Sequence, residues 1–312
     1  MNYRAFLSAT FQTVGLFMVG IIPVFGQIFA LFTPVPLILA YVRENRQEGF
    51  FALSMASLIV AALGGWTAAA MLFFSFGLMA MGTAEGMRRN LKPEQASLLG
   101  GLLPVAALLT IVAFYVLKVG KNPIIEIDLY LRETLAASVK TYTDLGLTEM
   151  AAMASSIPDS FIHYLTRLMP GIIVATSVTQ AACCYGIARA VILKKQGDAA
   201  GQTSLAAWHA PDSWVWGLIA ALTFIVIPHE TARLTGWNLA IIFGVVYLAQ
   251  GIAIVDHYLR RSRFKPFARG LFIAFILAMP SIVFAIALGI VDIWADFRKV
   301  REPITPIEPG AQ

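Results

Sequence analysis

A few polar side chains lie inside long apolar stretches of this sequence, where they can bond only to one another, to the backbone or to a bound molecule. They are Gln180, Asn238, Tyr247 and Gln250. Intramembrane polar groups are costly and often mark a substrate path. These four residues are therefore candidates for lining a small-molecule cavity. The alternative interpretation is hydrogen bonding between helices, as Asn and Gln do in membrane bundles.

A second set of residues combines aromatic rings and charges near the ends of apolar stretches. Tryptophan is enriched at the membrane–water interface. We predict that this set lies at that interface, against lipid or a partner protein. The set comprises Trp208, Trp216, Asp292, Trp294, Asp296 and Arg298.

The C-terminal part of that set has helical spacing. Ile293, Phe297 and Val300 would share one helix face. We therefore expect 292–301 to continue the last span as a helix along the membrane surface. Arg298 or Lys299 would contact a phosphate or an acidic neighbour, and 303–312 would be a flexible tail.

Enzymatic motifs are not apparent in this sequence. No phosphate-binding P-loop, HExxH or GxSxG motif occurs. The histidines, which are His163, His209, His229 and His257, are scattered without ligand spacing. Cys183 and Cys184 are adjacent, point apart on a helix and lack a CxxC spacing, so they are interpreted as small buried residues. We expect no catalytic residues, no metal site, no cofactor and no enzymatic activity.

The apolar stretches determine the expected fold class. Hydrophobic residues make up 58% of the chain and charged residues only 13%, against about 25% charged in soluble domains. The sequence predicts an all-α, polytopic transmembrane helix bundle of about eight spans, within a range of roughly seven to nine. The net charge of +5 lies at the ends of apolar stretches. It therefore indicates membrane anchoring rather than nucleic-acid binding.

The spans are separated by glycine, proline and basic residues. The N-terminal region is either one span over 6–31 followed by a re-entrant piece at 36–42, or a hairpin of two spans within 6–42. Gly64 and Gly65 are expected to form a tight turn. The later spans are predicted at 49–63, 66–87, 98–117, 170–193, 213–228, 237–258 and 270–291.

The segment 119–167 differs because it carries many charges. Asn122 and Pro123 predict a helix start, and apolar residues then recur at helical spacing. We expect an amphipathic helix on the extracytoplasmic membrane surface or over the bundle, and another short helix starting at Pro158. The predicted divisions are 1–118, 119–167, 168–302 and 303–312, the first and third being transmembrane halves of one integrated domain.

Basic residues in short loops predict the orientation. The loops that carry them should be cytoplasmic, which leaves 119–167 outside. These residues are Arg43, Arg46, Arg88, Arg89, Lys92, Lys194, Lys195, Arg260, Arg261, Arg263, Lys265 and Arg269. The C-terminus then falls outside with Arg298, Lys299 and Arg301, which conflicts with the same rule. One span more or fewer would remove that conflict.

Several motifs together resemble the YybS-like family of bacterial multi-pass membrane proteins, whose function is uncharacterised. The motifs are Pro34–Pro36, Trp208–Trp216, Trp237–Leu239, Val246–Gly251 and Leu288–Lys299, with Ala295 where an aromatic is expected. The resemblance covers nearly the whole chain. The family is distantly similar to the substrate-binding membrane components of energy-coupling-factor transporters. This implies a ligand-binding bundle without identifying the ligand.

The resemblance and the polar residues together favour one functional hypothesis. The protein is expected to be a non-enzymatic small-molecule-binding or transport component of the bacterial inner membrane. The alternative is a structural or assembly protein that organises partner proteins. The expected partners are the lipid bilayer, a small-molecule ligand and a membrane protein, without nucleic acid.

Overall fold

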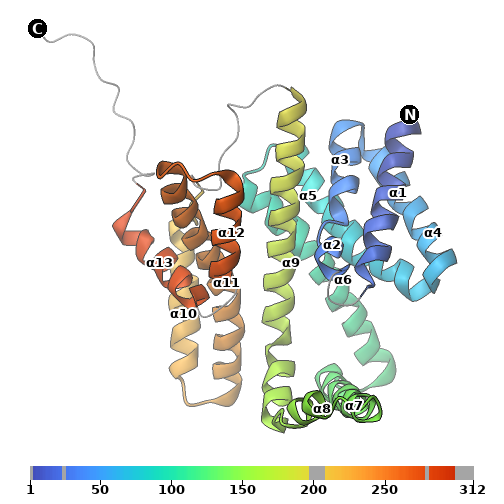
Figure 1. The fold of residues 1–312 in the computed structure, drawn as a ribbon, viewed down its shortest axis with the longest axis vertical. Helices are drawn as coiled ribbons and strands as arrows, with labels where there is room; N and C mark the ends of the chain where they lie inside the picture. The colour runs from blue at the N-terminus through green and yellow to red at the C-terminus, as the bar shows by residue number, and fades with distance from the viewer. Residues whose placement is uncertain (1–2, 23–25, 197–207, 278–280, 299–312) are drawn as a thin grey trace, which may run out of the picture. The chain divides into compact units, whose positions relative to one another are not determined.

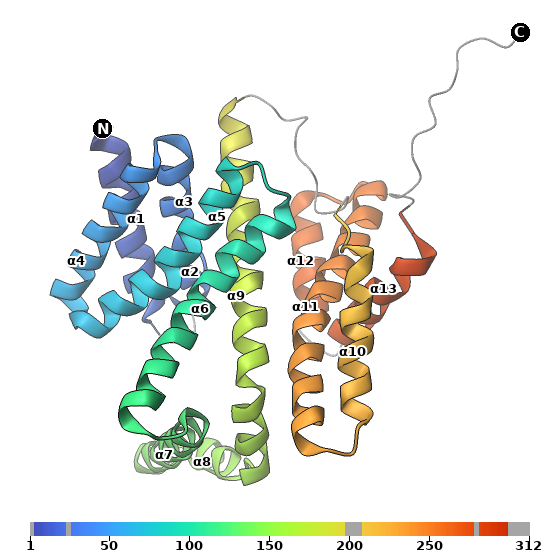
Figure 2. The same ribbon diagram turned by 180° about the vertical axis from the view of Figure 1, so that it is seen from behind.

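The computed structural model describes residues 3–22, 26–196, 208–277 and 281–298. Within these ranges every regular element is a helix, which confirms the all-α prediction. Contacts divide the chain into two compact units, Met1–Ala200 and Gly201–Gln312. Figures 1 and 2 show both units from opposite sides. The boundary between the units falls after the long helix α9, within the predicted C-terminal half of the chain, because α9 packs on α3, α5, α6 and α7.

Unit 1 contains nine α-helices and one π-helical turn among its described residues. They are α1 (Tyr3–Gly20), α2 (Gly26–Ala30), α3 (Pro34–Arg43), α4 (Arg46–Met71), the π-helix η1 (Leu72–Gly77), α5 (Leu78–Arg88), α6 (Pro93–Val119), α7 (Pro123–Asp144), α8 (Thr148–Ser155) and α9 (Asp159–Gln196). Helices α7 and α8 lie across the ends of α6 and α9 (Figure 2). The ends of α5 and α9 that carry the basic residues lie away from α7 and α8.

Unit 2 is built around one long helix. The described elements are the 3-10 turn η4 (Asp212–Trp214), α10 (Val215–Val226), α11 (Glu230–Arg261), α12 (Pro266–Leu277) and α13 (Ser281–Ala295). Helix α11 contacts each of α10, α12 and α13. Residues on α11 are therefore placed where side chains from most of the unit converge.

Five helical stretches in the described ranges are long and apolar enough to cross a bilayer. They are Gly26–Arg43, Arg46–Arg88, Pro93–Val119, Asp159–Lys194 and Glu230–Arg261. Two shorter apolar helices, Asp212–Val226 and Ser281–Ala295, accompany them. The membrane-protein class is supported by these lengths, whereas the count of about eight spans stays a prediction.

Several predicted helix boundaries are confirmed. Gly65 interrupts α4 with φ 82° and ψ 173°, a backbone region open mainly to glycine. Helix α3 begins at Pro34 and packs against α1, as the hairpin interpretation of the N-terminal region requires. Helix α7 begins at Pro123, and the Asn122 side chain accepts a hydrogen bond from the Ile124 amide.

Other predicted boundaries are wrong. The helix expected to start at Pro158 is not short. Helix α9 runs unbroken from Asp159 to Gln196 and contains Pro170. A proline removes one backbone donor and usually kinks or ends a helix, yet here the helix continues. The predicted last span 270–291 coincides with parts of α12 and α13, and 278–280 between them lie outside the described residues.

The predicted helix over 292–301 is also wrong beyond Ala295, where α13 ends. Asp296 has φ 38°, and the Asp292 side chain accepts the Phe297 amide, so the chain turns. Phe297 lies beside Tyr258 and Ser262, at the end of α11 that carries the basic turn. Phe297 thus lies at the same end of α11 as the basic turn, whereas the prediction put the C-terminus on the opposite side of the membrane from the basic loops. Lys299, Val300 and 303–312 lie outside the described residues.

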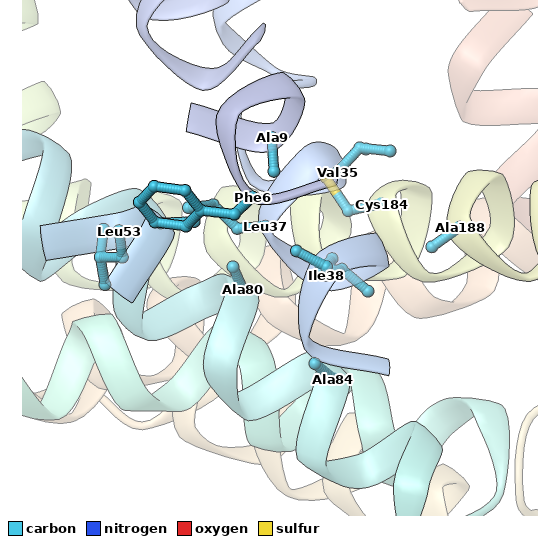
Figure 3. Packing of buried hydrophobic residues seen from close by; sticks show 12 residues of the cluster. Phe6, Ala9, Val35, Leu37, Ile38, Leu53, Ala80, Ala84, Cys184 and Ala188 are labelled. Atoms are coloured by element: carbon cyan, nitrogen blue, oxygen red, sulfur yellow. The ribbon is translucent and has the colours of Figure 1, made fainter. Parts of the chain in front are cut away.

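The core of unit 1 joins segments far apart in the sequence. Side chains of α1, α3, α4, α5 and α9 meet in one buried apolar cluster (Figure 3). Cys184 is buried in it, as predicted, whereas the prediction of a buried Cys183 is wrong because that residue faces away from the cluster and is exposed. Small residues allow close helix contacts as well, since a Cβ on Gly86 would lie 2.7 Å from Ala96.

Candidate functional site

A buried polar cluster in unit 2 contains Gln250, Asp292 and Arg298. Gln250 is on α11 and fully buried. Its side-chain carbonyl accepts a hydrogen bond of 3.2 Å from the Ala210 amide. Its Nε2 donates at 3.0 Å to the Asp292 carboxylate on α13. Gln250 therefore links the segment before α10 to the last described helix.

Asp292 is the centre of the cluster. Its Oδ2 accepts from Gln250 and also from the Arg298 guanidinium at 2.9 Å. Its Oδ1 accepts from the Phe297 amide at 2.9 Å. The Asp292 and Arg298 side chains are only 3% and 1% exposed. A buried carboxylate needs such compensation, because an unpaired charge in a low-dielectric interior is very costly.

Arg298 completes the cluster from the other direction. Its Nη1 donates at 2.8 Å to the Trp208 carbonyl, while its Nη2 binds Asp292. Helix α13 ends at Ala295, and the chain turns at Asp296. Because of this turn, the Arg298 side chain reaches back to Asp292. The two ends of the described part of unit 2 are consequently joined by one side chain.

Tyr247 lies one helical turn before Gln250 and is also buried. It packs in an apolar cluster with Ala210 and Leu218. Its hydroxyl has no hydrogen-bond partner among the described residues. Buried hydroxyls usually find a partner, so this group is an unused donor within a polar region of the protein interior. The backbone of Tyr247 packs closely on α13, since a Cβ on Gly289 would fall 2.0 Å from the Tyr247 carbonyl oxygen.

The structure places the four predicted cavity residues in different surroundings. Tyr247 and Gln250 are one turn apart in the interior of unit 2. Asn238 donates to the Leu234 carbonyl of its own helix at 2.9 Å. Gln180 belongs to unit 1, where its amide donates to the Leu31 carbonyl at 3.1 Å. Gln180, Asn238 and Gln250 thus each form hydrogen bonds to other groups of the protein.

The predicted interfacial set is divided as well. Trp216 and Trp294 are strongly exposed, as an interfacial position requires. Trp208 and Asp296 are partly buried. Asp292 and Arg298 are interior residues rather than interfacial ones, because each neutralises the other. Arg298 does contact an acidic neighbour as predicted, although no helix carries it there.

A second carboxylate in unit 2 was not predicted as a site. Asp256 is buried on α11 and pairs with Arg260 at 2.8 Å and with Arg269 at 3.3 Å. The i, i+4 spacing of Asp256 and Arg260 is a signal that sequence reasoning could have used. Arg269 is thirteen positions away and follows the turn after α11, so no local spacing identified it.

Unit 1 has a charged cluster of a different kind around Glu85 on α5. The carboxylate accepts from Arg46 at 2.6 Å, from Arg89 at 2.7 Å and from the Tyr41 hydroxyl at 2.8 Å. Arg88 donates to the Tyr41 carbonyl at 3.0 Å. The cluster joins the ends of α3, α4 and α5 where basic loop residues gather.

The chemistry available to the buried cluster is binding rather than metal ligation. Within the described ranges, no three His, Cys, Asp or Glu side chains come close enough to hold a metal ion. The cluster offers a guanidinium, a carboxylate, a primary amide and a phenol hydroxyl. These groups suit hydrogen bonding to a small polar molecule or to the protein itself.

Comparison with known proteins identifies a family but no characterised relative. Residues 11–293 match the model of a family described as "Predicted membrane protein (DUF2232)". No curated protein and no solved structure matches the chain.

Proposed function

Because the chain belongs to the DUF2232 family of predicted membrane proteins, we propose that it is a non-enzymatic component of the bacterial inner membrane that binds or transports a small molecule. The observation that carries this proposal is an ionic pair, Asp292 with Arg298, inside a helical unit. Asp292 lies on the apolar helix α13, and ionisable residues within membrane helices are rare and often mark substrate or ion paths. The resemblance to substrate-binding transporter components agrees with this proposal.

The Tyr247 hydroxyl is the group that we assign to the ligand. It is buried beside the polar cluster and is free to donate, whereas Gln250 already donates and accepts. A ligand with a hydrogen-bond acceptor, such as a small polar metabolite, would satisfy this donor. Admission of the ligand requires the segment Trp208–Pro211 to move, since its Ala210 covers this region.

One observation favours the alternative function, a structural or assembly role. Gln250 and Asp292 bond to groups of the protein itself, so the cluster holds α11 and α13 together. A protein that organises partners needs a rigid unit rather than an accessible cavity. The two functions predict different effects of removing the Tyr247 hydroxyl: ligand affinity falls only if the protein binds a small molecule there.

The test compares the unmodified protein with Tyr247→Phe in lipid nanodiscs. Small molecules are extracted from the purified protein, identified by mass spectrometry, and added back in a thermal-shift assay. Tyr247→Phe should leave the ligand-free protein as stable or more stable, because a buried unbonded hydroxyl costs about 1–3 kcal/mol. Affinity for the ligand should fall about threefold to tenfold, the worth of one hydrogen bond.

The control is Tyr185→Phe, which removes a hydroxyl that accepts from Arg189 on α9 in unit 1. This variant should lose stability and keep the ligand affinity. Unchanged affinity in Tyr247→Phe would reject Tyr247 as the ligand contact. An unmodified protein that carries and binds no small molecule would favour the assembly role.

A further inference from the structure

An apolar groove on unit 2 borders the buried cluster at Phe297, whose amide bonds to Asp292. It has a volume of about 330 Å³ and is lined by α11, α12, α13 and the turn after α13. The lining residues are Ile254, Val255, Tyr258, Leu259, Ser262, Phe272, Leu288 and Phe297. This volume is at the lower end of the range of about 300–1,000 Å³ that holds ordered small ligands.

The groove is apolar along its length, and its polar groups are largely occupied. The Tyr258 hydroxyl already donates to the Phe297 carbonyl at 3.0 Å. Tyr258, Phe272 and Phe297 are all exposed. An open channel of aliphatic and aromatic side chains on a membrane helix fits a hydrocarbon chain, because dispersion contacts need no hydrogen bonds.

Exposed cations surround the end of the groove at Ser262. Arg261 and Arg263 flank this lining residue, and Lys265 follows on the same turn. The turn is fixed by backbone bonds from Arg263 to Arg260 and from Phe264 to Leu259, with Arg263 at φ 59°. Arg260 and Arg269 are engaged by Asp256, which leaves the three exposed cations for an external anion.

We propose that this groove binds an anionic phospholipid, with one acyl chain along α11 and the phosphate on the turn formed by Arg261, Arg263 and Lys265. The charge of the turn complements a phosphate, and the lining of the groove complements an acyl chain. Each basic residue near an anionic membrane surface adds to the attraction. Positive charge at a helix C-terminus also stabilises the helix through its dipole. The experiment must therefore distinguish specific lipid binding from attraction by net positive charge.

The test uses the full chain in phosphatidylcholine nanodiscs that contain a photoactivatable phosphatidylglycerol with a diazirine in its acyl chain. Cross-linked peptides are mapped by mass spectrometry. Adducts should concentrate on groove residues such as Val255, Leu259 and Leu288. A phosphatidylcholine probe with the same chain should give far fewer adducts there.

Two charge variants then test the headgroup contact. The triple variant Arg261→Gln, Arg263→Gln, Lys265→Gln should reduce phosphatidylglycerol cross-linking in the groove about tenfold or more. The control removes equal charge from exposed sites of unit 1 by Lys118→Gln, Lys140→Gln and Lys194→Gln. It should leave the yield in the groove unchanged.

Three results would overturn the proposal. Adducts could be spread evenly over the exposed apolar surface, the two probes could label the groove equally, or both triple variants could lower the yield alike. The first two results would mean ordinary solvation by lipid. The third would mean non-specific attraction by net charge. Because the mapping uses the unmodified protein, it remains decisive if a variant fails to fold.

Discussion

The Glu85 cluster of unit 1 and the Asp292 cluster of unit 2 both place one carboxylate among arginine and hydrogen-bond donors, yet their surroundings differ. The arginine partners of Glu85, Arg46 and Arg89, have side chains 59% and 65% exposed. The Arg298 side chain is 1% exposed. The same chemical pairing therefore operates in two dielectric environments.

This difference assigns different roles to the two clusters. Coulomb attraction between exposed charges is screened, and surface ion pairs contribute little to stability. Glu85 therefore mainly fixes the positions of helix ends that carry the basic loop residues. Burying an ion pair costs desolvation free energy, and removing one partner costs more because the other charge is then left uncompensated. The Asp292 pair therefore determines which arrangement of unit 2 is allowed.

The largest expected effect tests the interior pair. Replacing Arg298 by Met leaves Asp292 buried without its cation, and should lower the free energy of unfolding by about 3–5 kcal/mol. Denaturant titration of the protein in detergent would measure this loss. The double variant Arg298→Met, Asp292→Asn removes both charges and should recover most of the stability. A cost as small as that of a surface pair would abolish the contrast between the two clusters.

A smaller effect is expected for the neutral member of the cluster. Gln250→Leu removes bonds to Ala210 and Asp292, and should cost about 0.6–2 kcal/mol. Asn238→Leu is the control, because the Asn238 amide donates within its own helix, and it should cost less. A large loss of stability with ligand binding intact would show that Gln250 clamps helices and contacts no ligand.

The smallest effect is expected in unit 1. Glu85→Gln removes the charge but keeps an acceptor for Tyr41, and should cost about 1 kcal/mol or less. That cost should shrink further in high salt, whereas the cost of Arg298→Met should not, because buried pairs are screened much less. Thermal unfolding at two salt concentrations would measure both. Equal salt dependence would remove the distinction between the exposed and buried pairs.

Most of the helical fold could be predicted because hydrophobic length and breaking residues are local signals. Gly65 and Asn122 mark helix boundaries through their own backbone and side-chain preferences, and both are confirmed. Pro170 shows the limit of such rules, since helix α9 passes through it. Tertiary packing against α6 and other helices stabilises a helix that proline alone would disfavour.

The site was less predictable because its bonds are not local. Tyr247 and Gln250 were recognised as polar residues on one helix face, and both are buried. The partners of Gln250 are 40 and 42 positions away, and one of them is a backbone amide. Arg298 pairs with Asp292 across a turn rather than at helical spacing, so the assumption of a continuing helix hid the ion pair.

The separation of Gln250 from Asp292 also sets an order of events during biosynthesis. Helix α11 is synthesised 42 residues before the carboxylate that binds the Gln250 amide. At the usual rate of chain growth this interval lasts about 2–8 s. During it the Gln250 amide lacks the carboxylate to which it donates in the folded protein. The polar cluster of unit 2 can therefore close only after Asp292 and Arg298 have been synthesised.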